Sequence, residues 1–391
     1  MVSVIAISQP AMKKFLLLLL LIPATFTYAQ ERTMYVIDNV PVIYDPAPGD
    51  TIAKSEIEEV KVVKDAGKIF AMGYKNMDAV IFITSKEYAA RPDSLKAIAT
   101  TSAMTKKNGA WFAPNDKKPY TGRFIDYYLN GKKQGEGKLK NGKFAGLRRL
   151  YYRNGNVSDE IEYADGIATG NEKQFYKNGQ LSLKSLIDNA TQSGTVEMYH
   201  QNGTLKKRTE YKMGKAEGKT ETFYSTGALK YEETYVDGEP VKDKKREKLR
   251  SLFSQGIAAD KEGNFKTAIK KYSQCIEQDA NFADAYYALG TAKLNSMDFE
   301  AAIIDFNKAL TIEPLFMEVY ANRAFALIRK YEFSNSRELS KGSGVVVMAT
   351  KKAEIPKTDK DRICADLSKA IELGDDVPVV LKAFDEYCKK K

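Results

Sequence analysis

One glycine recurs every 24 residues through the middle third of this 391-residue chain, at Gly122, Gly146, Gly170, Gly194 and Gly218. A mostly aromatic pair follows each glycine at a constant distance, and a turn dipeptide, Asn-Gly in four of the five units, follows the pair. A second turn comes eleven residues after the first. A fixed period of this length is typical of a stacked array of repeats. Such arrays present extended surfaces, so the repeat favours a binding function over catalysis.

Two turns per unit, separated by aromatic and β-branched residues, predict two short strands in each repeat. Asn-Gly is the strongest short hairpin signal, because type I′ turns need positive φ at both central residues. A hairpin of this size cannot bury its own apolar face, so we expect the five units to stack into one antiparallel sheet. The third unit departs from the pattern, since Asn189-Ala190 replaces its second turn glycine.

The repeat resembles the MORN family in its bacterial variant, over about residues 117–241. The resemblance lies in Tyr-Tyr-Arg-Asn-Gly-Asn-Val at 151–157 and Tyr-Ala-Asp-Gly at 163–166. The family is known for scaffolding and surface association, and some bacterial members are described as antitoxin-like. The resemblance therefore implies a binding surface.

The N-terminus has the three parts of a secretory signal peptide. These parts are a Lys-Lys pair at 13–14, an apolar run at 15–22 and a Thr-Tyr-Ala cleavage signal at 27–29. We expect cleavage before Gln30, with Met12 as an alternative start to Met1. The apolar run is too short to span a bilayer; a buried or anchoring helix is the alternative interpretation. The mature chain is predicted to be exported, without a transmembrane segment, and periplasmic or associated with the outer membrane.

The chain carries 61 basic and 51 acidic residues, a formal net charge of +10, and the basic excess is uneven. Residues 117–153 hold eleven Lys or Arg against two acidic residues. We predict that Lys132, Lys133, Arg148 and Arg149 contact an anionic surface; a solvated strand face is the alternative. Export argues against nucleic acid and toward anionic lipid or lipopolysaccharide.

Residues 34–86 alternate strand and helix signals. Strands are predicted at 34–42, 59–64 and 79–84, and Asp65 can cap a short helix that runs to about Met72. The segments 57–66, 73–74 and 78–86 resemble the plug domain of TonB-dependent outer-membrane receptors. The resemblance covers only roughly 55 residues, whereas a receptor also needs a barrel of about 22 strands. It implies an interaction module in the envelope of a Gram-negative bacterium of the Bacteroidetes type, and it does not imply transport.

From about Lys244 a period of 3.6 residues replaces the hairpin signals. A tetratricopeptide (TPR) pattern is carried by Tyr286, Leu289, Gly290, Ala302, Phe306, Ala309 and Pro314. We expect one repeat before it, and one after it that is interrupted over 334–360 and closed by a helix from Pro378 to Tyr387. Within the insertion, the apolar run 345–348 is either a partner-binding strand or a packed or disordered stretch.

The TPR family binds peptides in a groove lined by the first helix of each repeat. The resemblance places Phe253, Ile257, Tyr287, Thr291, Phe325 and Arg329 in this groove; ordinary packing or exposure is the alternative for each. Ala288 sits where the central Asn of a carboxylate-clamp TPR domain would be. Capture of a C-terminal carboxylate is therefore not predicted.

Three cysteines remain to be assigned. Because an exported chain meets an oxidising compartment, we predict a disulfide between Cys364 and Cys388. Helix rise brings the two ends level if the last helix folds back antiparallel; two packed thiols that never meet are the alternative. Cys275 is expected to be a buried, inert thiol.

No catalytic pattern stands out. The one histidine, His200, fills a position that is Tyr in the other four repeats, so it is predicted to be a structural substitute. Metal-binding His/Cys spacings, a nucleophile elbow and a phosphate loop are not found in the sequence. We predict no catalytic residue, no metal and no cofactor.

The sequence thus predicts a multidomain α+β protein with three modules. The segments are a signal peptide at 1–29, a plug-like α+β module at 30–100, a linker or cap at 101–116, five antiparallel β repeats at 117–241 and an all-α TPR solenoid at 244–391. The predicted function is a non-enzymatic scaffold or adaptor that binds outer-membrane or other envelope proteins. An envelope protein that binds glycan or lipopolysaccharide through the basic, aromatic β face is the alternative, and an enzyme with an unrecognised site is a third hypothesis.

Overall fold

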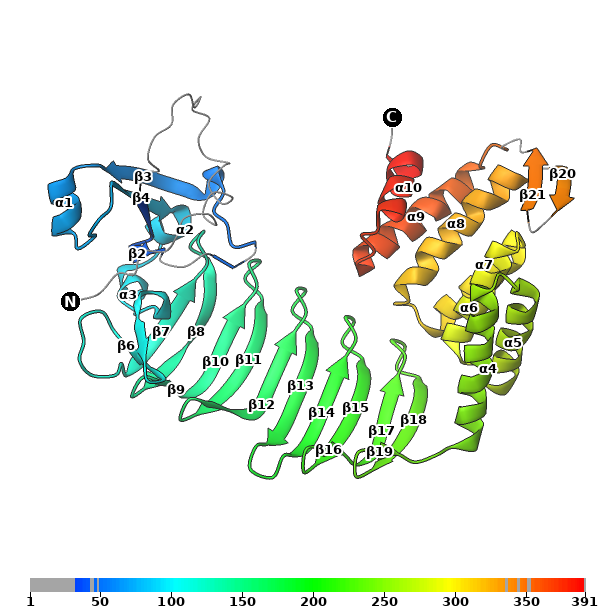
Figure 1. Cartoon of the computed structure of the whole chain (residues 1–391), viewed down its shortest axis with the longest axis horizontal. Helices are drawn as coiled ribbons and strands as arrows, with labels where there is room; N and C mark the ends of the chain where they lie inside the picture. The colour runs from blue at the N-terminus through cyan, green and yellow to red at the C-terminus, as the bar shows by residue number, and fades with distance from the viewer. Residues whose placement is uncertain are drawn as a thin grey trace. The chain divides into compact units, whose positions relative to one another are not determined.

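The computed structural model describes residues 32–42, 46–47, 49–334, 337–342, 345–349 and 353–389. The predicted signal peptide lies outside the described residues. Contacts divide the chain into two compact units, Met1–Val196 and Glu197–Lys391. The division falls within strand β14 (Ser193–Tyr199) (Figure 1). The N-terminal unit holds a small α+β module and the first repeats, and the C-terminal unit holds the last repeats and a helical solenoid.

A four-stranded sheet in the order β2-β1-β4-β3 begins the N-terminal unit. Its strands are β1 (Thr33–Ile37), β2 (Val40–Pro41), β3 (Ile57–Val63) and β4 (Ala79–Ser85). Ile69 of helix α1 (Ala66–Ala71) packs with Val36 and Val80 in the core of this module. Asp65 caps α1 by accepting a hydrogen bond from the Lys68 N–H at 2.8 Å. The predicted strands and the capped helix are therefore confirmed.

A short connecting region covers the first repeat. Its elements are η2 (Lys54–Glu56), α2 (Lys86–Ala89), α3 (Asp93–Lys96), η3 (Thr101–Ala103), β5 (Thr105–Lys107) and β6 (Ala110–Phe112). Met104 and Trp111 pack against Phe124 and Leu139 of the first repeat. Trp111 thus packs on the first hairpin, within the predicted linker or cap at 101–116. Buried Asp126 fixes the same region by accepting three hydrogen bonds of 2.7–2.9 Å from the two threonines at 100 and 101.

Antiparallel strands in the order β13-β12-β11-β10-β8-β7 make up the repeats of the N-terminal unit. They are β7 (Gly122–Tyr127), β8 (Lys133–Lys140), β10 (Gly146–Tyr151), β11 (Val157–Ala164), β12 (Ile167–Phe175) and β13 (Leu181–Asp188), and the short β9 (Lys143–Phe144) pairs with β8. Most side chains of β10 to β13 are half-buried or exposed. Strands β10 to β13 thus form a single layer whose two faces are both partly exposed.

The two turns of each repeat have different conformations. At the second turn of the four repeats that keep its glycine, both residues of the dipeptide have positive φ, as in Asn141 (50°) and Gly142 (74°), which is a type I′ turn. At the first turn, in the repeats that carry Asn-Gly, positive φ is confined to the glycine, as in Gly155 (90°). The prediction of type I′ geometry was wrong there. The strands shift register by one residue beside the first turn, between Leu150 and Tyr151 for example, and this bulge accommodates a type I turn followed by a left-handed glycine.

The second residue of each aromatic pair links its repeat to the next. The Tyr128 hydroxyl donates to the Tyr151 carbonyl at 2.6 Å, and Tyr152 repeats this bond, also at 2.6 Å, one repeat later. In the C-terminal unit, His200 Nε2 lies 3.0 Å from the Phe223 carbonyl oxygen. His200 therefore makes the contact that its tyrosine counterparts make, and its prediction as a structural substitute is confirmed.

Strands in the order β19-β18-β17-β15 continue the array in the C-terminal unit, with β16 beside β15. They are β15 (Leu205–Lys212), β16 (Lys215–Ala216), β17 (Gly218–Phe223), β18 (Leu229–Val236) and β19 (Glu239–Pro240). The helices that follow are α4 (Lys244–Lys261), α5 (Phe265–Gln278), α6 (Ala283–Asn295), α7 (Phe299–Ile312), α8 (Met317–Phe333), α9 (Lys357–Leu373) and α10 (Pro378–Cys388). The predicted combination of β repeats and a TPR solenoid is thus confirmed.

Glycines let paired helices of the solenoid cross closely. A Cβ atom on Gly256 would lie 2.4 Å from the ring of Tyr272, and one on Gly290 would lie 2.7 Å from the ring of Phe306. Both aromatic rings are almost fully buried. The small residues of the TPR pattern therefore allow these helices to cross closely.

The solenoid packs on the last repeat within the C-terminal unit. Buried Tyr224 occupies the linking position of that repeat, and its hydroxyl donates at 2.5 Å to the carbonyl of Asn281, in the connection between α5 and α6. An ion pair of 2.6 Å joins Lys230 to Asp284. The Asn281 carbonyl of the solenoid therefore accepts the hydrogen bond that a backbone carbonyl of a further repeat would accept.

The insertion between α8 and α9 contains a short hairpin. Strands β20 (Arg337–Gly342) and β21 (Val345–Ala349) pair antiparallel in a sheet of their own. Helix α9 begins at Lys357, a few residues earlier than predicted. The described part of the insertion therefore has a defined backbone, and the apolar run 345–348 lies in a strand.

Candidate protein-binding surface

Helices α4, α6 and α8, each the first of a helix pair in the solenoid, carry the six predicted groove residues. Tyr287 and Thr291 lie one turn apart on α6, where the Thr291 hydroxyl donates to the Tyr287 carbonyl at 2.9 Å. Asn322 of α8 reaches across with its side-chain amide, which lies 3.4 Å from the Tyr287 hydroxyl and 3.2 Å from the Thr291 hydroxyl. These three side chains make a polar link between α6 and α8, called the polar bridge below.

The other predicted groove residues divide into packed and exposed groups. Phe253 of α4 is half-buried and stacks on Phe282 with ring centroids 5.1 Å apart. Phe325 of α8 packs against the core formed by α8, α9 and α10. Ile257 and Arg329 are exposed. The structure thus joins Tyr287 with Thr291, and it leaves Ile257 and Arg329 accessible to a partner.

Negative charge surrounds the polar bridge. Burial raises the pKa of the Tyr287 hydroxyl, and the nearby carboxylates of Glu318 and Asp375 raise it further. These two carboxylates favour a neutral or cationic group beside Tyr287 over a further carboxylate.

Asn322 was missed by sequence reasoning. It lies 34 residues after Ala288, so it occupies the same position of the following repeat. A polar residue in a slot that an alanine fills one repeat earlier is the signal that could have identified it.

The four basic residues predicted to contact an anionic surface do not share one face. Arg148 and Arg149 are consecutive strand residues, so their side chains point to opposite faces of the sheet. Arg149 Nε donates at 2.8 Å to Glu160, which also lies 3.6 Å from Lys173. The Arg148 guanidinium lies over the Phe144 ring, 4.5 Å from its centroid. Both arginines are thus engaged within the sheet.

Lys132 and Lys133 line a cleft of about 510 Å³ in the N-terminal unit. The cleft lies between the segment around α2 and α3 and the first repeats, and its other basic residues are Arg91 and Arg123. Arg91 lies 3.5 Å from the Tyr127 ring centroid, and Lys133 pairs with Glu136 at 3.2 Å. The charges of the cleft are therefore partly balanced, and its exposed cations are Lys132 and Arg123.

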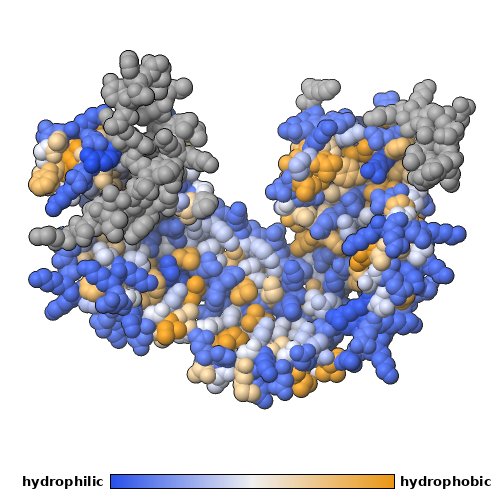
Figure 2. All heavy atoms as spheres, in the orientation of Figure 1, coloured by the Kyte–Doolittle hydropathy of each residue, from blue (hydrophilic) through white to orange (hydrophobic). Residues whose placement is uncertain are grey.

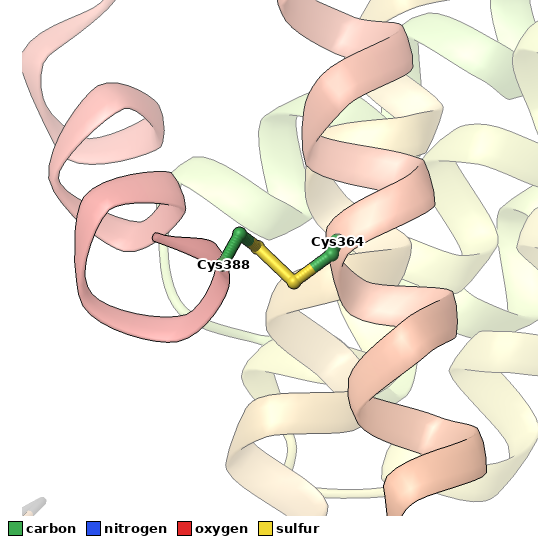
Figure 3. Close-up of a disulfide and its surroundings, with 2 residues drawn as sticks. All are labelled: Cys364 and Cys388. Carbon is green, nitrogen blue, oxygen red and sulfur yellow. A yellow bond between two sulfur atoms is a disulfide. The ribbon is translucent and has the colours of Figure 1, made fainter. Parts of the chain in front are cut away.

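A disulfide joins Cys364 of α9 to Cys388 at the end of α10 (Figure 3). The two Cα atoms are 5.4 Å apart. Val380 and Ala383 of α10 are buried with α8 and α9, whereas Val379 and Leu381 are exposed. Figure 2 shows apolar side chains at the surface of the C-terminal helices.

Cys275 is buried, and burial raises the pKa of its thiol to about 11, so it stays protonated at neutral pH.

Removal of the disulfide is expected to loosen the C-terminal helix. The Cys364→Ser substitution should lower the free energy of unfolding of the solenoid by about 3 kcal/mol, because the bond closes a loop with a sequence separation of 24 residues. Urea unfolding followed by circular dichroism measures this. Reductant should destabilise the unsubstituted protein to the same degree and leave the variant unchanged. Full alkylation of both cysteines without reductant, seen by peptide mapping, would contradict the bond.

Within the described residues, no cluster of three or more His, Cys, Asp or Glu side chains is arranged to hold a metal ion. None of the described helices is both long and apolar enough to cross a membrane.

Comparison with protein families identifies both kinds of repeat. A model of the MORN repeat variant matches residues 145–165, 168–189, 192–213 and 216–237. A TPR repeat model matches 261–295 and a tetratricopeptide repeat model matches 283–314. The chain therefore carries MORN and tetratricopeptide repeats, and these family models describe no catalytic activity. The first predicted β repeat is not among the matched residues, although β7 and β8 form its hairpin.

Similar proteins resemble only part of the chain. The Protein SGT1 homolog of rice (Oryza sativa subsp. japonica) is 26% identical over 140 residues, which are 34% of this chain and 38% of the rice protein. The TPR domain of Arabidopsis OM64 is 18% identical with a TM-score of 0.29, over 38% of this chain and 99% of that domain. The TPR2B domain of yeast Sti1 is 20% identical with a TM-score of 0.28, over 36% of this chain and 96% of that one.

Proposed function

We propose that this protein is an exported, non-enzymatic scaffold of the bacterial envelope that binds a segment of another envelope protein on its TPR helices. The polar bridge carries the proposal. Its hydroxyl and amide groups come from two successive first helices, and the exposed Arg329 lies further along α8. Groups of this kind give a binding surface hydrogen bonds that fix the register of a peptide.

The remaining segments are assigned supporting roles in this proposal. Residues 1–29 direct export and are removed, and residues 30–100 form an interaction module. Residues 101–116 cap the array, the repeats at 117–241 provide an extended surface, and 244–391 bind the partner. The acidic surroundings of Tyr287 favour a partner segment that is neutral or basic there.

Charge reversal on the first-helix face should release the partner. Full-length tagged protein would be purified from its native envelope, and bound proteins would be quantified by mass spectrometry. Arg329→Glu is expected to reduce the bound partner at least about fivefold, because it removes an exposed guanidinium donor and reverses the charge on the first-helix face. Lys308→Glu, an equal charge change at an exposed position on the second helix α7, is the matched control. Equal recovery from both variants would contradict this location.

A further inference from the structure

The first turns of the β repeats offer a recurring backbone donor. In each of the five repeats the glycine N–H closes the turn by donating to the carbonyl of the residue three positions earlier, as from Gly179 to Tyr176 at 2.8 Å. The second residue of each turn, called the tip residue below, directs its own N–H away from this closing bond. The tip residues are Leu129, Arg153, Lys177, Gln201 and Ser225.

Carboxylates occupy the tip at both terminal repeats. In the N-terminal unit, the Leu129 N–H donates at 3.0 Å to Asp50, from the loop before η2. In the C-terminal unit, the Ser225 N–H donates at 2.9 Å to Glu313, from the connection between α7 and α8. Asp50 and Glu313 belong to unrelated modules, so two different parts of the chain bind the equivalent donor with the same chemical group.

Lys177 presents the same donor at an internal repeat. Its side chain is exposed, and no described group accepts from its N–H. Its carbonyl accepts from the side-chain amides of Asn154 at 2.7 Å and Asn156 at 2.8 Å, which fix the turn in place. The neighbouring tip residue, Arg153, is also basic and donates with its guanidinium to the Gly49 and Thr51 carbonyls beside Asp50.

We propose that the tips at Arg153 and Lys177 dock an acidic protein segment, whose carboxylates accept from the tip N–H groups as Asp50 does at Leu129. The basic side chains at both tips complement the charge of such a segment. The tip at Leu129, one repeat before Arg153, already binds the carboxylate of Asp50, so the proposed contact would extend one that exists. This surface is separate from the TPR helices and does not depend on the function proposed for them.

The repeat geometry sets the spacing that the segment needs. Adjacent repeats are two strands apart, and strands in a sheet lie about 4.8 Å apart, so successive tips are about 10 Å apart. A polyproline II segment rises about 3.1 Å per residue and has three residues per turn. Two carboxylates three residues apart in such a segment lie on one side of it, about 9 Å apart, and therefore match two successive tips.

Proline provides a selective test, because it lacks the N–H yet is favoured at the second position of a type I turn. Lys177→Pro removes both the donor and the charge, whereas Lys177→Ala removes the charge alone. The probe is a fluorescent Gly-Ser peptide with two glutamates three residues apart, titrated by anisotropy at low salt against the full chain. We expect Lys177→Pro to weaken binding about tenfold, as for one charge-assisted hydrogen bond, and Lys177→Ala only about twofold.

A second measurement needs no variant. Amide hydrogen exchange in the unsubstituted protein should slow at the 176–179 turn when the peptide is added. Equal weakening by the two substitutions, unaltered exchange at the turn, or no saturable binding of the peptide would each overturn the proposal. Binding to phosphatidylglycerol vesicles that Lys177→Pro abolishes, without peptide binding, would also overturn it, because the ligand would then be a membrane.

Discussion

Replacing Gly170 by alanine is expected to destabilise the repeat sheet far more than the same change at Gly146, although both glycines occupy the same position of the repeat. Both have positive φ, 90° at Gly170 and 69° at Gly146, which costs an alanine about 1–2 kcal/mol. At Gly170 a Cβ atom would also lie 2.0 Å from the carbonyl oxygen of Ile187. At Gly146 the nearest atom, in the Glu162 carboxylate, is 3.9 Å away.

Backbone atoms cannot move aside as a flexible side chain does, so the clash adds about 1–3 kcal/mol at Gly170. We expect a loss of about 4 kcal/mol for Gly170→Ala and about 1–2 kcal/mol for Gly146→Ala. Urea unfolding of the full chain, followed by far-ultraviolet circular dichroism, measures both. Equal losses would mean that the sheet relaxes freely around Gly170 and would refute the close approach to Ile187.

Substitution of Asp366 is expected to have a comparably large effect in the solenoid. Arg323 of α8 donates two hydrogen bonds to the carboxylate of Asp366 in α9, at 2.6 and 2.8 Å, and a third at 2.7 Å to Asn307 of α7. Asp366 is only 4% exposed. Asp366→Ala leaves the guanidinium with little water and no counter-charge, which typically costs about 3–5 kcal/mol.

The double variant Arg323→Met, Asp366→Leu separates two explanations. If the loss in Asp366→Ala comes from an unpaired charge, removal of both charges should restore much of the stability. Thermal unfolding monitored at 222 nm provides the comparison. A double variant as unstable as Asp366→Ala would show instead that the solenoid depends on the shape of the pair or on the bond to Asn307.

The repeats and the helices could be predicted from the sequence because each is encoded by a local period. The 24-residue spacing defined the hairpins, and the TPR pattern placed Gly256 and Gly290 at close crossings. The turn type was harder to predict from the sequence, since Asn-Gly occurs in two kinds of turn. The one-residue bulge that selects between them depends on the pairing of two strands, as between Leu150 and Tyr151.

The candidate site could be predicted only in part. Family spacing identified Tyr287 and Thr291, but their link to Asn322 depends on how two helices pack. Charge counting grouped Arg148 with Arg149, whereas strand geometry separates them and Glu160 pairs with the second. Composition reports how many charges a segment has, and only the folded sheet determines which of them have partners.

The bonds that link successive repeats have a consequence for how such a chain can change over evolutionary time. Each linking side chain, such as Tyr128 or Tyr152, donates to a backbone carbonyl, a group that every residue possesses. Tyr224 donates in the same way to the carbonyl of Asn281 in the helical solenoid. A gene duplication or deletion of one whole repeat would therefore leave a suitable acceptor at the new junction, whatever residue stood there. The length of the array can thus be inherited as a variable trait while its two ends stay the same.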